Sequence, residues 1–279
     1  MPRTLKSLKT PLRYPGGKSR ALANLFRFLP DLSQAKEYRE PFLGGGSVAI
    51  EVTKRYPNLP IWVNDLYKPL YLFWTALRDD GNYLYDQLIQ LKQRHPDPGS
   101  AKQLFLDAKE KVNDDDIGYK DKAVAFYIIN KCSFSGLTES SSFSPQASES
   151  NFSIRGIENL KTYSILIKNW KITNNNYNDL LTNDESIVTY LDPPYEIKSN
   201  LYGKKGNMHK GFDHDGFATL CDQFDGHQLI SYNSSQLIRD RFKEWTVSEF
   251  AHTYTMRSVG CYNKVQASRK ELVLFNYEV

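Results

Sequence analysis

Residues 38–65, YREPFLGGGSVAIEVTKRYPNLPIWVND, decide the expected fold. A short strand-like run ends at Glu40 and leads into three consecutive glycines, 44–46. Ser47 is then expected to cap a helix over 48–55, and the run 61–65 is typical of a buried strand that ends in an acid, Asp65. Strand, glycine-rich turn, helix and strand form one βαβ unit, which is typical of an α/β fold.

Strand-like segments return only towards the end of the chain. The runs 187–191, 227–233 and 271–277 are apolar and rich in β-formers, and the apolar positions of 217–224 follow helical spacing. The middle of the chain differs, because 67–132 has the pattern of successive helices and 133–156 that of a long Ser-rich loop. We therefore expect an α/β fold in which both ends of the chain build a Rossmann-like sheet, with helices on both faces and a mostly helical insertion.

The glycine-rich turn is a signal for a nucleotide. Gly44 and Gly46 permit the backbone to approach a ligand closely, and an acid at the end of the next strand, Asp65, can accept hydrogen bonds from a ribose diol. With Ala49, the two glycines also fit a relaxed dinucleotide fingerprint. On these residues alone, NAD stays an alternative.

A second glycine-containing run, YPGGKSR at 14–20, has the lysine and serine of a phosphate-binding loop. Leu12 stands where that loop requires its first glycine, so the pattern argues against a nucleoside triphosphate. Lys18 is therefore expected to serve a different ligand.

The run YLDPPY at 190–195 carries the most specific chemistry. Two prolines stop the strand directly after Asp192 and hold its carboxylate at the carboxyl end of the sheet, where open α/β sheets bind ligands. The Pro193 carbonyl is a second acceptor, and Tyr195 offers a flat ring. Two acceptors beside a stacking face match a planar amino group on an aromatic ring.

Composition narrows the class of protein. The net charge is only +4, but basic residues are concentrated in two segments. Residues 1–20 hold six Lys or Arg and no acid, and residues 198–210 hold four Lys and no acid. These segments either contact a polyanion or form solvated surface. Three scattered cysteines give neither a disulfide framework nor zinc spacing, and we expect no metal. No apolar run is long enough to span a membrane, and the cysteine usage fits a reducing cytosol, so a cytoplasmic protein is expected. We also expect a protein of bacterial or phage type.

Four motifs in order, YPGGKSR, EPFLGGGS, VND and YLDPPY, resemble those of the Dam-type (alpha group, D12 class) DNA adenine-N6 methyltransferases. The tail SRKELVLFNY, 268–277, is similar to the last strand region of that family. The resemblance implies a Rossmann-like methyltransferase sheet in 1–66 and 167–279, with 67–166 as an inserted target-recognition domain. It also implies methyl transfer from S-adenosylmethionine to the exocyclic amine of an adenine flipped out of duplex DNA.

The resemblance assigns site residues as well. The catalytic set would be Asp192, Pro193 and Tyr195. The cofactor-binding set would be Tyr14, Lys18, Glu40, Phe42, Gly44, Gly46, Asp65 and Asp192. Family members often carry tryptophan where this chain has Tyr14, which keeps an aromatic face at that position.

For DNA, the resemblance points to the run NKCSFSGLTES, 130–140, as the loop that enters the duplex. Phe134 and Ser135 would then intercalate and contact bases. Better-known members carry an arginine where this chain has Glu139, so a GATC target does not follow. The remaining DNA-binding candidates are Arg155 as a guanine reader, and Lys204 and Lys205 as backbone contacts.

Several alternatives stay open on the sequence. They are a methyltransferase acting on RNA or a protein amide, a non-catalytic DNA-binding protein on the same fold, and an NAD-dependent enzyme. Intact Lys18, Asp65 and Asp192 argue against a decayed site, and the DPPY run argues against NAD. The expected partner is double-stranded DNA; a cognate restriction endonuclease is left open, and a monomer is the default expectation.

Overall fold

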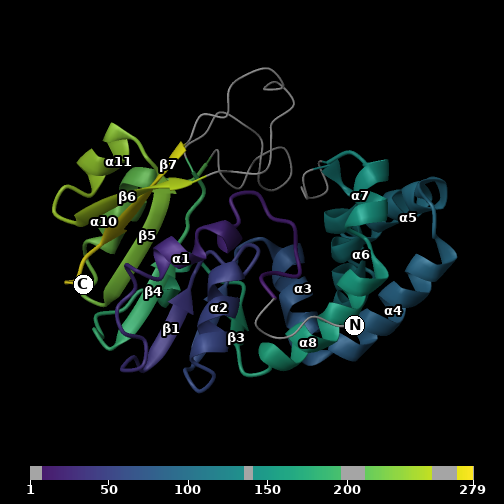
Figure 1. The fold of residues 1–279 in the computed structure, drawn as a ribbon, viewed down its shortest axis with the longest axis horizontal. Helices are drawn as coiled ribbons and strands as arrows, with labels where there is room; N and C mark the ends of the chain where they lie inside the picture. Colours follow the sequence, from purple (N-terminus) through teal and green to yellow (C-terminus); the bar gives the residue numbers. More distant parts are fainter. Residues whose placement is uncertain (1–7, 135–140, 196–210, 253–268, 279) are drawn as a thin grey trace.

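A computed structural model describes residues 8–134, 141–195, 211–252 and 269–278. A mixed sheet of seven strands, in the order β3-β2-β1-β4-β5-β7-β6, forms one half of the molecule (Figure 1). The strands are β1 (Glu37–Glu40), β2 (Ile61–Asn64), β3 (Lys171–Thr173), β4 (Ile187–Leu191), β5 (His227–Asn233), β6 (Thr246–His252) and β7 (Arg269–Phe275). The first five pair in parallel, whereas β7 runs antiparallel to both of its neighbours.

Side chains of the central strands alternate between two hydrophobic clusters, one on each face of the sheet. In β7, Val273 belongs to one cluster and Leu272 to the other, and β4, which is buried along its whole length, divides in the same way. A strand buried on both faces needs helices on both faces. The expected α/β sheet with two covered faces is therefore confirmed.

Helices from different parts of the chain cover the two faces (Figure 1). On one face lie α1 (Leu22–Leu25) and α2 (Ser47–Arg55), preceded by the short 3-10 helix η2 (Lys18–Arg20). On the other face lie α10 (His214–Cys221) and α11 (Gln236–Arg241), with the 3-10 helix η4 (Tyr177–Leu180) before β4.

The middle of the chain forms the second half of the molecule, as the helical pattern predicts (Figure 1). Its helices are α3 (Lys68–Asp79), α4 (Gly81–Arg94), α5 (Pro98–Lys111), α6 (Tyr119–Cys132), α7 (Pro145–Ser150) and α8 (Ile154–Leu166). The stretch 133–156 is not a continuous loop, because Ser144 caps α7 and Ser153 caps α8 with their side chains. From Lys122 to Cys132, α6 is buried on all sides, because it is packed among α3, α4, α5 and α7.

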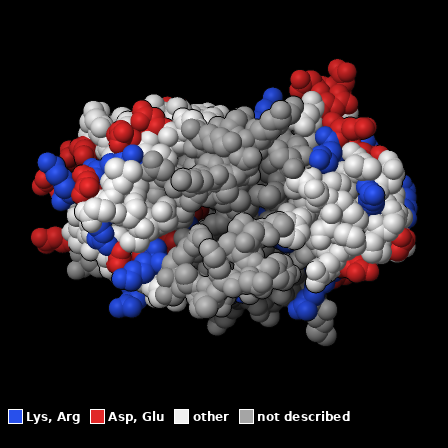
Figure 2. Space-filling view, turned by 90° about the horizontal axis from the view of Figure 1, so that it is seen from above, with Lys and Arg blue, Asp and Glu red and all other residues white. Residues whose placement is uncertain are grey.

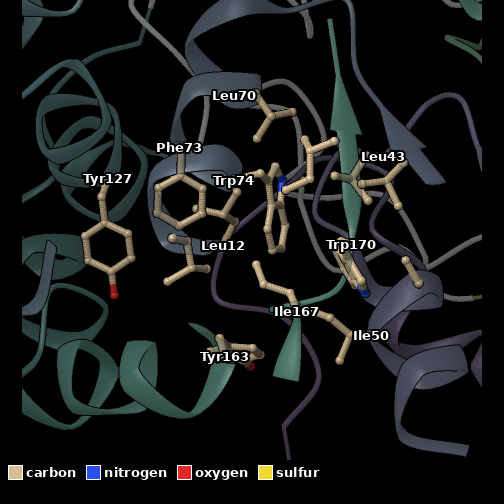
Figure 3. Close-up of a cluster of buried hydrophobic side chains, with 14 of the residues drawn as sticks. Leu12, Leu43, Ile50, Leu70, Phe73, Trp74, Tyr127, Tyr163, Ile167 and Trp170 are labelled. Carbon is tan, nitrogen blue, oxygen red and sulfur yellow. The ribbon is translucent and has the colours of Figure 1, made fainter. Parts of the chain in front are cut away.

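The core of this helical half is continuous with the core of the sheet (Figure 3). Trp74 of α3 packs on Trp170, with ring centroids 5.7 Å apart, and the Trp170 indole N–H donates to Thr53 of α2 at 2.8 Å. Phe73 stacks on Tyr127 of α6 at 5.8 Å. No boundary between separate cores is resolved within the described residues, so the division at 66/67 and 166/167 stays a prediction.

Candidate active site

From β1 the chain adds β2 and β3 on one side of the sheet, and β4 and β5 then follow on the other side. The order of the strands therefore changes direction between β1 and β4, which pair in parallel with Tyr38 opposite Val188. The carboxyl ends of strands at such a point diverge and leave room for a ligand. Here they open into a cavity of about 370 Å³, lined by Glu40 after β1, Asp192 after β4 and Asp65 after β2. That volume falls within the range of roughly 300–1,000 Å³ typical of small-molecule sites.

The glycine turn after β1 forms one wall of this cavity. Gly44 and Gly46 have φ angles of 49° and 66°, in the left-handed region that favours glycine. A Cβ atom on Gly44 would lie 2.8 Å from the ring of Tyr14, which packs directly on the turn. Gly46 is the N-cap of α2, so Ser47 begins the helix instead of capping it as expected.

Asp65 fixes this turn from the next strand. Its two carboxylate oxygens accept hydrogen bonds from the backbone N–H groups of Gly44 at 2.9 Å and Tyr67 at 3.0 Å. Burial raises the pKa of Asp65 to about 6, and those two N–H donors limit the rise. Each carboxylate oxygen has a second lone pair, so the group can still accept from a ligand in the cavity.

Glu40 lies at the floor of the cavity and is 2% exposed. The Tyr38 hydroxyl donates to one of its oxygens at 3.0 Å. Burial raises the pKa of Glu40 well above its usual value, more than the Tyr38 hydrogen bond lowers it. Burial therefore disfavours a negative charge on this carboxyl group.

Lys18 and Asp192 form the polar centre of the site. The Lys18 Nζ atom lies 2.7 Å from both carboxylate oxygens of Asp192 and 2.8 Å from the Tyr195 hydroxyl. The Ser231 hydroxyl also donates to Asp192, at 2.9 Å. Lys18 is 2% exposed, whereas the Asp192 side chain is 21% exposed and faces the cavity.

The charges within this centre shift its pKa values. Burial lowers the pKa of Lys18, but the charges of Asp192 and Glu271 outweigh burial and leave that pKa raised. Burial raises the pKa of Asp192, the Lys18 ammonium opposes this, and the charge of Glu271 adds to the rise. An ammonium thus stays bound between acidic groups at neutral pH.

Glu271 is the site residue that the sequence analysis missed. It lies on β7, is fully buried, and accepts a hydrogen bond from the Tyr195 hydroxyl at 2.5 Å, with Lys18 Nζ 3.3 Å away. The available signal was an acid at the start of the apolar strand run ELVLF. A carboxylate in such a run needs a buried cationic partner.

Every described residue of the expected catalytic and cofactor-binding sets lines the one cavity. These residues are Tyr14, Lys18, Glu40, Phe42, Gly44, Gly46, Asp65, Asp192, Pro193 and Tyr195. Aromatic residues that the sequence did not single out, Tyr177 and Phe212, pack around Phe42 at the rim. The roles of all these residues stay predictions.

The two described DNA-binding candidates, Phe134 and Arg155, are not among the residues that line this cavity. Phe134 is 48% exposed after the end of α6, and Arg155 is exposed in the first turn of α8. Ser135, Lys204 and Lys205 fall outside the described residues. Basic and acidic side chains are intermixed at both ends of the face in Figure 2, so the described part of that face shows no single continuous basic patch.

Two kinds of feature are absent from the described residues, a metal-ligand cluster and a membrane-spanning helix. Among the described residues, no group of three or more His, Cys, Asp or Glu is arranged to hold a metal ion. In the same ranges, every helix is too short or too polar to cross a membrane.

Comparison with known proteins identifies the family. A family model for the D12 class N6 adenine-specific DNA methyltransferases matches residues 14–257. The chain is 28% identical to the Type II methyltransferase M.MjaIII of Methanocaldococcus jannaschii, over 68% of this chain and 70% of that protein. It is 21% identical to the Type II methyltransferase M.CviBI of Paramecium bursaria Chlorella virus NC1A, over 97% and 100% of the two chains.

A bacterial relative extends this set. The DNA adenine methylase of Vibrio cholerae serotype O1 is 24% identical, over 78% of this chain and 76% of that protein. The family match spans the glycine turn, the DPPY run and the helical half between them. The chain therefore belongs to the D12 class N6 adenine-specific DNA methyltransferases, and it is a site-specific DNA adenine methyltransferase.

Proposed function

We propose that this enzyme methylates N6 of an adenine flipped out of duplex DNA, with Asp192 as the acceptor that holds the target amine. The observation that carries the proposal is the position of Asp192, which directly follows a buried strand and faces a cavity shared with the glycine turn. A base within a duplex cannot reach a carboxylate at the edge of a cavity, so the target adenine has to leave the stack.

The family implies S-adenosylmethionine as the methyl donor, and the cavity fits it. The left-handed glycines let the turn approach a ligand without a Cβ atom in the way, and Asp65 keeps acceptor capacity for ribose hydroxyls. When bound, S-adenosylmethionine supplies a methyl group on a sulfonium and leaves as S-adenosylhomocysteine. The residues proposed to hold it are Tyr14, Lys18, Glu40, Phe42, Gly44, Gly46, Asp65 and Asp192.

The proposed work of the protein is orientation and electrostatics. An exocyclic amine is a poor nucleophile because its lone pair is delocalised into the ring. Asp192 and the Pro193 carbonyl, by accepting from the two N–H bonds, would favour the pyramidal nitrogen of the transition state. The ring of Tyr195 would stack on the flipped base. After methyl transfer the nitrogen would release one proton to the Asp192 carboxylate, which would pass it to water.

The helical half, with 67–166 as the proposed target-recognition domain, is the candidate for DNA recognition. Ser133 and Phe143 pair as an antiparallel bridge, and the Phe134 backbone N–H donates to Ser142 at 3.0 Å. These contacts tie together the two ends of the segment proposed to enter the duplex. The Arg13 guanidinium donates to the Ser133 carbonyl at 2.8 Å. This hydrogen bond links the start of the segment to the residue just before Tyr14.

A defined transfer experiment tests the proposed function. Purified enzyme is incubated with labelled S-adenosylmethionine and unmethylated genomic DNA, and the DNA is digested to nucleosides. The expected product is N6-methyladenine, and sequencing the modified positions would give the target site. Label in N4-methylcytosine, or label only in RNA or protein added to the same reaction, would contradict the proposal.

The biological setting is a proposal of its own. Two relatives are Type II methyltransferases, which supports a restriction–modification role with a cognate endonuclease. A cytoplasmic monomer stays a prediction. The relatives come from a bacterium, an archaeon and a virus, which supports an origin of bacterial or phage type.

Binding of the cofactor is expected to depend on pH through Asp65. With a pKa of about 6 this group is ionised above that pH and protonated below it, and an ionised carboxylate is the stronger acceptor for a hydroxyl. Between about pH 7.5 and about pH 5, the dissociation constant for S-adenosylmethionine should rise roughly tenfold. Calorimetric titration at several pH values measures this change.

Asp65→Asn is the matched variant, because it keeps the size of the side chain but cannot titrate. Its affinity should be weaker at neutral pH and nearly constant across the same pH window. If the variant retains the pH dependence of the parent enzyme, another group such as Glu40 controls binding and the role of Asp65 is wrong.

A further inference from the structure

We infer that Glu271 is a positioning residue that holds the Lys18 ammonium and the Tyr195 hydroxyl, so that Asp192 is free to accept the target amine. The inference rests on the proposed function, because it assumes that Asp192 binds that amine. It adds a residue from the far end of the chain that is not among those lining the cavity.

Glu271 is held rigidly at the edge of the sheet where ligands bind. It pairs with Asn233 at the carboxyl end of β5 and with Phe250 of β6, so its backbone is fixed by both neighbouring strands. Because β7 is antiparallel, its first residues lie at the same edge as the carboxyl ends of β4 and β5. Its side chain is fully buried, and a buried carboxylate persists only with compensating partners.

Those partners are the groups that surround Asp192. Lys18 Nζ donates to the Tyr195 hydroxyl at 2.8 Å, and that hydroxyl donates in turn to Glu271. This relay fixes the hydroxyl end of the Tyr195 ring, and the Lys18 ammonium lies 4.9 Å from the ring centroid. Glu271 therefore sets the orientation of the aromatic face proposed to stack on the flipped base.

The donors and acceptors around Lys18 explain why a second acid is needed. An ammonium has three N–H donors, and in this structure both oxygens of Asp192 compete for them. When Asp192 accepts from the target amine, three acceptors remain beside Lys18: the Tyr195 hydroxyl, Glu271 at 3.3 Å and the Gly16 carbonyl at 3.1 Å. Three donors then meet three acceptors, and the charge of Lys18 stays balanced by Glu271.

Among the described residues, Lys18 forms ion pairs with Asp192 and Glu271, so without the charge of Glu271 only the pair with Asp192 would remain. The ammonium would then hold the oxygens that the amine needs. Glu271→Gln keeps the size of the side chain and one acceptor oxygen for Tyr195, but it removes the charge and turns the other oxygen into an NH₂ donor. The single-turnover rate of methyl transfer to unmethylated genomic DNA should fall roughly 10- to 100-fold, the cost of small displacements of reacting groups.

Readouts other than rate separate positioning from a structural role. For Glu271→Gln, the dissociation constant for S-adenosylmethionine should stay within about threefold of the parent value, and the melting temperature should change little. Glu244→Gln, at a side chain that is 83% exposed, is the matched control and should match the parent in all three measurements. A loss of cofactor binding that equals the loss of rate would overturn the inference.

A double variant gives the sharpest test. If Glu271 acts through Lys18, then Lys18→Met/Glu271→Gln should be no slower than Lys18→Met alone, since the ammonium to be positioned is gone. Losses that add in the double variant, or a parent rate in Glu271→Gln, would overturn the inference. Should Glu271→Gln fail to fold, Tyr195→Phe tests the same relay: a slower rate with cofactor binding retained supports it, and an unchanged rate overturns it.

Failure of the proposed function would look different. Asp192→Asn is assayed in parallel, and retained transfer by that variant would remove the acceptor on which both proposals depend. Loss of transfer in Asp192→Asn together with a parent rate in Glu271→Gln would overturn only the inference about Glu271.

Discussion

Replacing Asp192 by asparagine should lower the single-turnover rate of methyl transfer about a thousandfold, which is the largest loss expected at a single acceptor. The asparagine side chain has the same shape, but one carboxylate oxygen becomes an NH₂ donor. That donor would face either the Lys18 ammonium or the target amine, both of which need acceptors. The measurement is transfer of labelled methyl groups to unmethylated DNA at saturating cofactor.

The fold of this variant should remain intact. Lys18 keeps Glu271 at 3.3 Å as a counter-charge, and the Ser231 hydroxyl can still donate to the remaining oxygen. Asp115→Asn is the matched control because that side chain is 94% exposed and its ion-pair partner, Lys122, does not line the cavity. We expect the control within about twofold of the parent rate. Activity near the parent level in Asp192→Asn would show that another group holds the amine.

The βαβ unit and the DPPY run could be predicted because both depend on neighbours in the sequence. A strand that ends at Glu40, glycines that need positive φ and prolines that stop a strand are local features. Position in the sheet follows from them, since successive carboxyl ends of parallel strands meet at one edge. This is why Asp65 and Asp192 were both expected at the cavity that they line.

The partners of Lys18 could not be predicted in this way. On residues alone the run 14–20 resembles a phosphate-binding loop, and only the family resemblance pointed to a cofactor site. Its contact with Asp192 joins residues 174 positions apart, and the contact between Tyr195 and Glu271 joins residues 76 positions apart. Such contacts depend on the sheet order, which places antiparallel β7 beside β5.

The packing of the helical half against the sheet half could not be predicted from the sequence either. Helical periodicity shows that α3 has an apolar face, but it does not show what that face meets. The structure places Trp74 of that face against Trp170 and against the glycine turn itself, where its indole N–H donates to the Gly44 carbonyl at 3.1 Å. A helix expected to belong to DNA recognition thus supports the glycine turn that forms one wall of the cavity.

That support leads to the second large effect, on stability. Gly46→Ala should lower the free energy of unfolding by about 3 kcal/mol, since a left-handed φ costs an alanine roughly 1–2 kcal/mol and overpacking costs roughly 1–3 kcal/mol more. The φ of Gly46 is 66°, and a Cβ atom there would lie 2.7 Å from Cζ2 of Trp74. Trp74 is fully buried, so its ring cannot move away from the added methyl group without disrupting the surrounding packing. Urea denaturation followed by circular dichroism measures the loss.

Gly118→Ala is the matched control, because its φ is −65° and a Cβ atom there would meet nothing within 4 Å. The same substitution at that position should leave stability unchanged within about 0.5 kcal/mol. The contact with Trp74 has its own test: Trp74→Phe removes part of the indole, so its cost and that of Gly46→Ala should be less than additive in the double variant. If the two costs add strictly, the backbone conformation of Gly46 is the whole cause of the loss. If Gly46→Ala and Gly118→Ala have equal urea midpoints, neither the conformation nor the packing of the glycine turn limits stability.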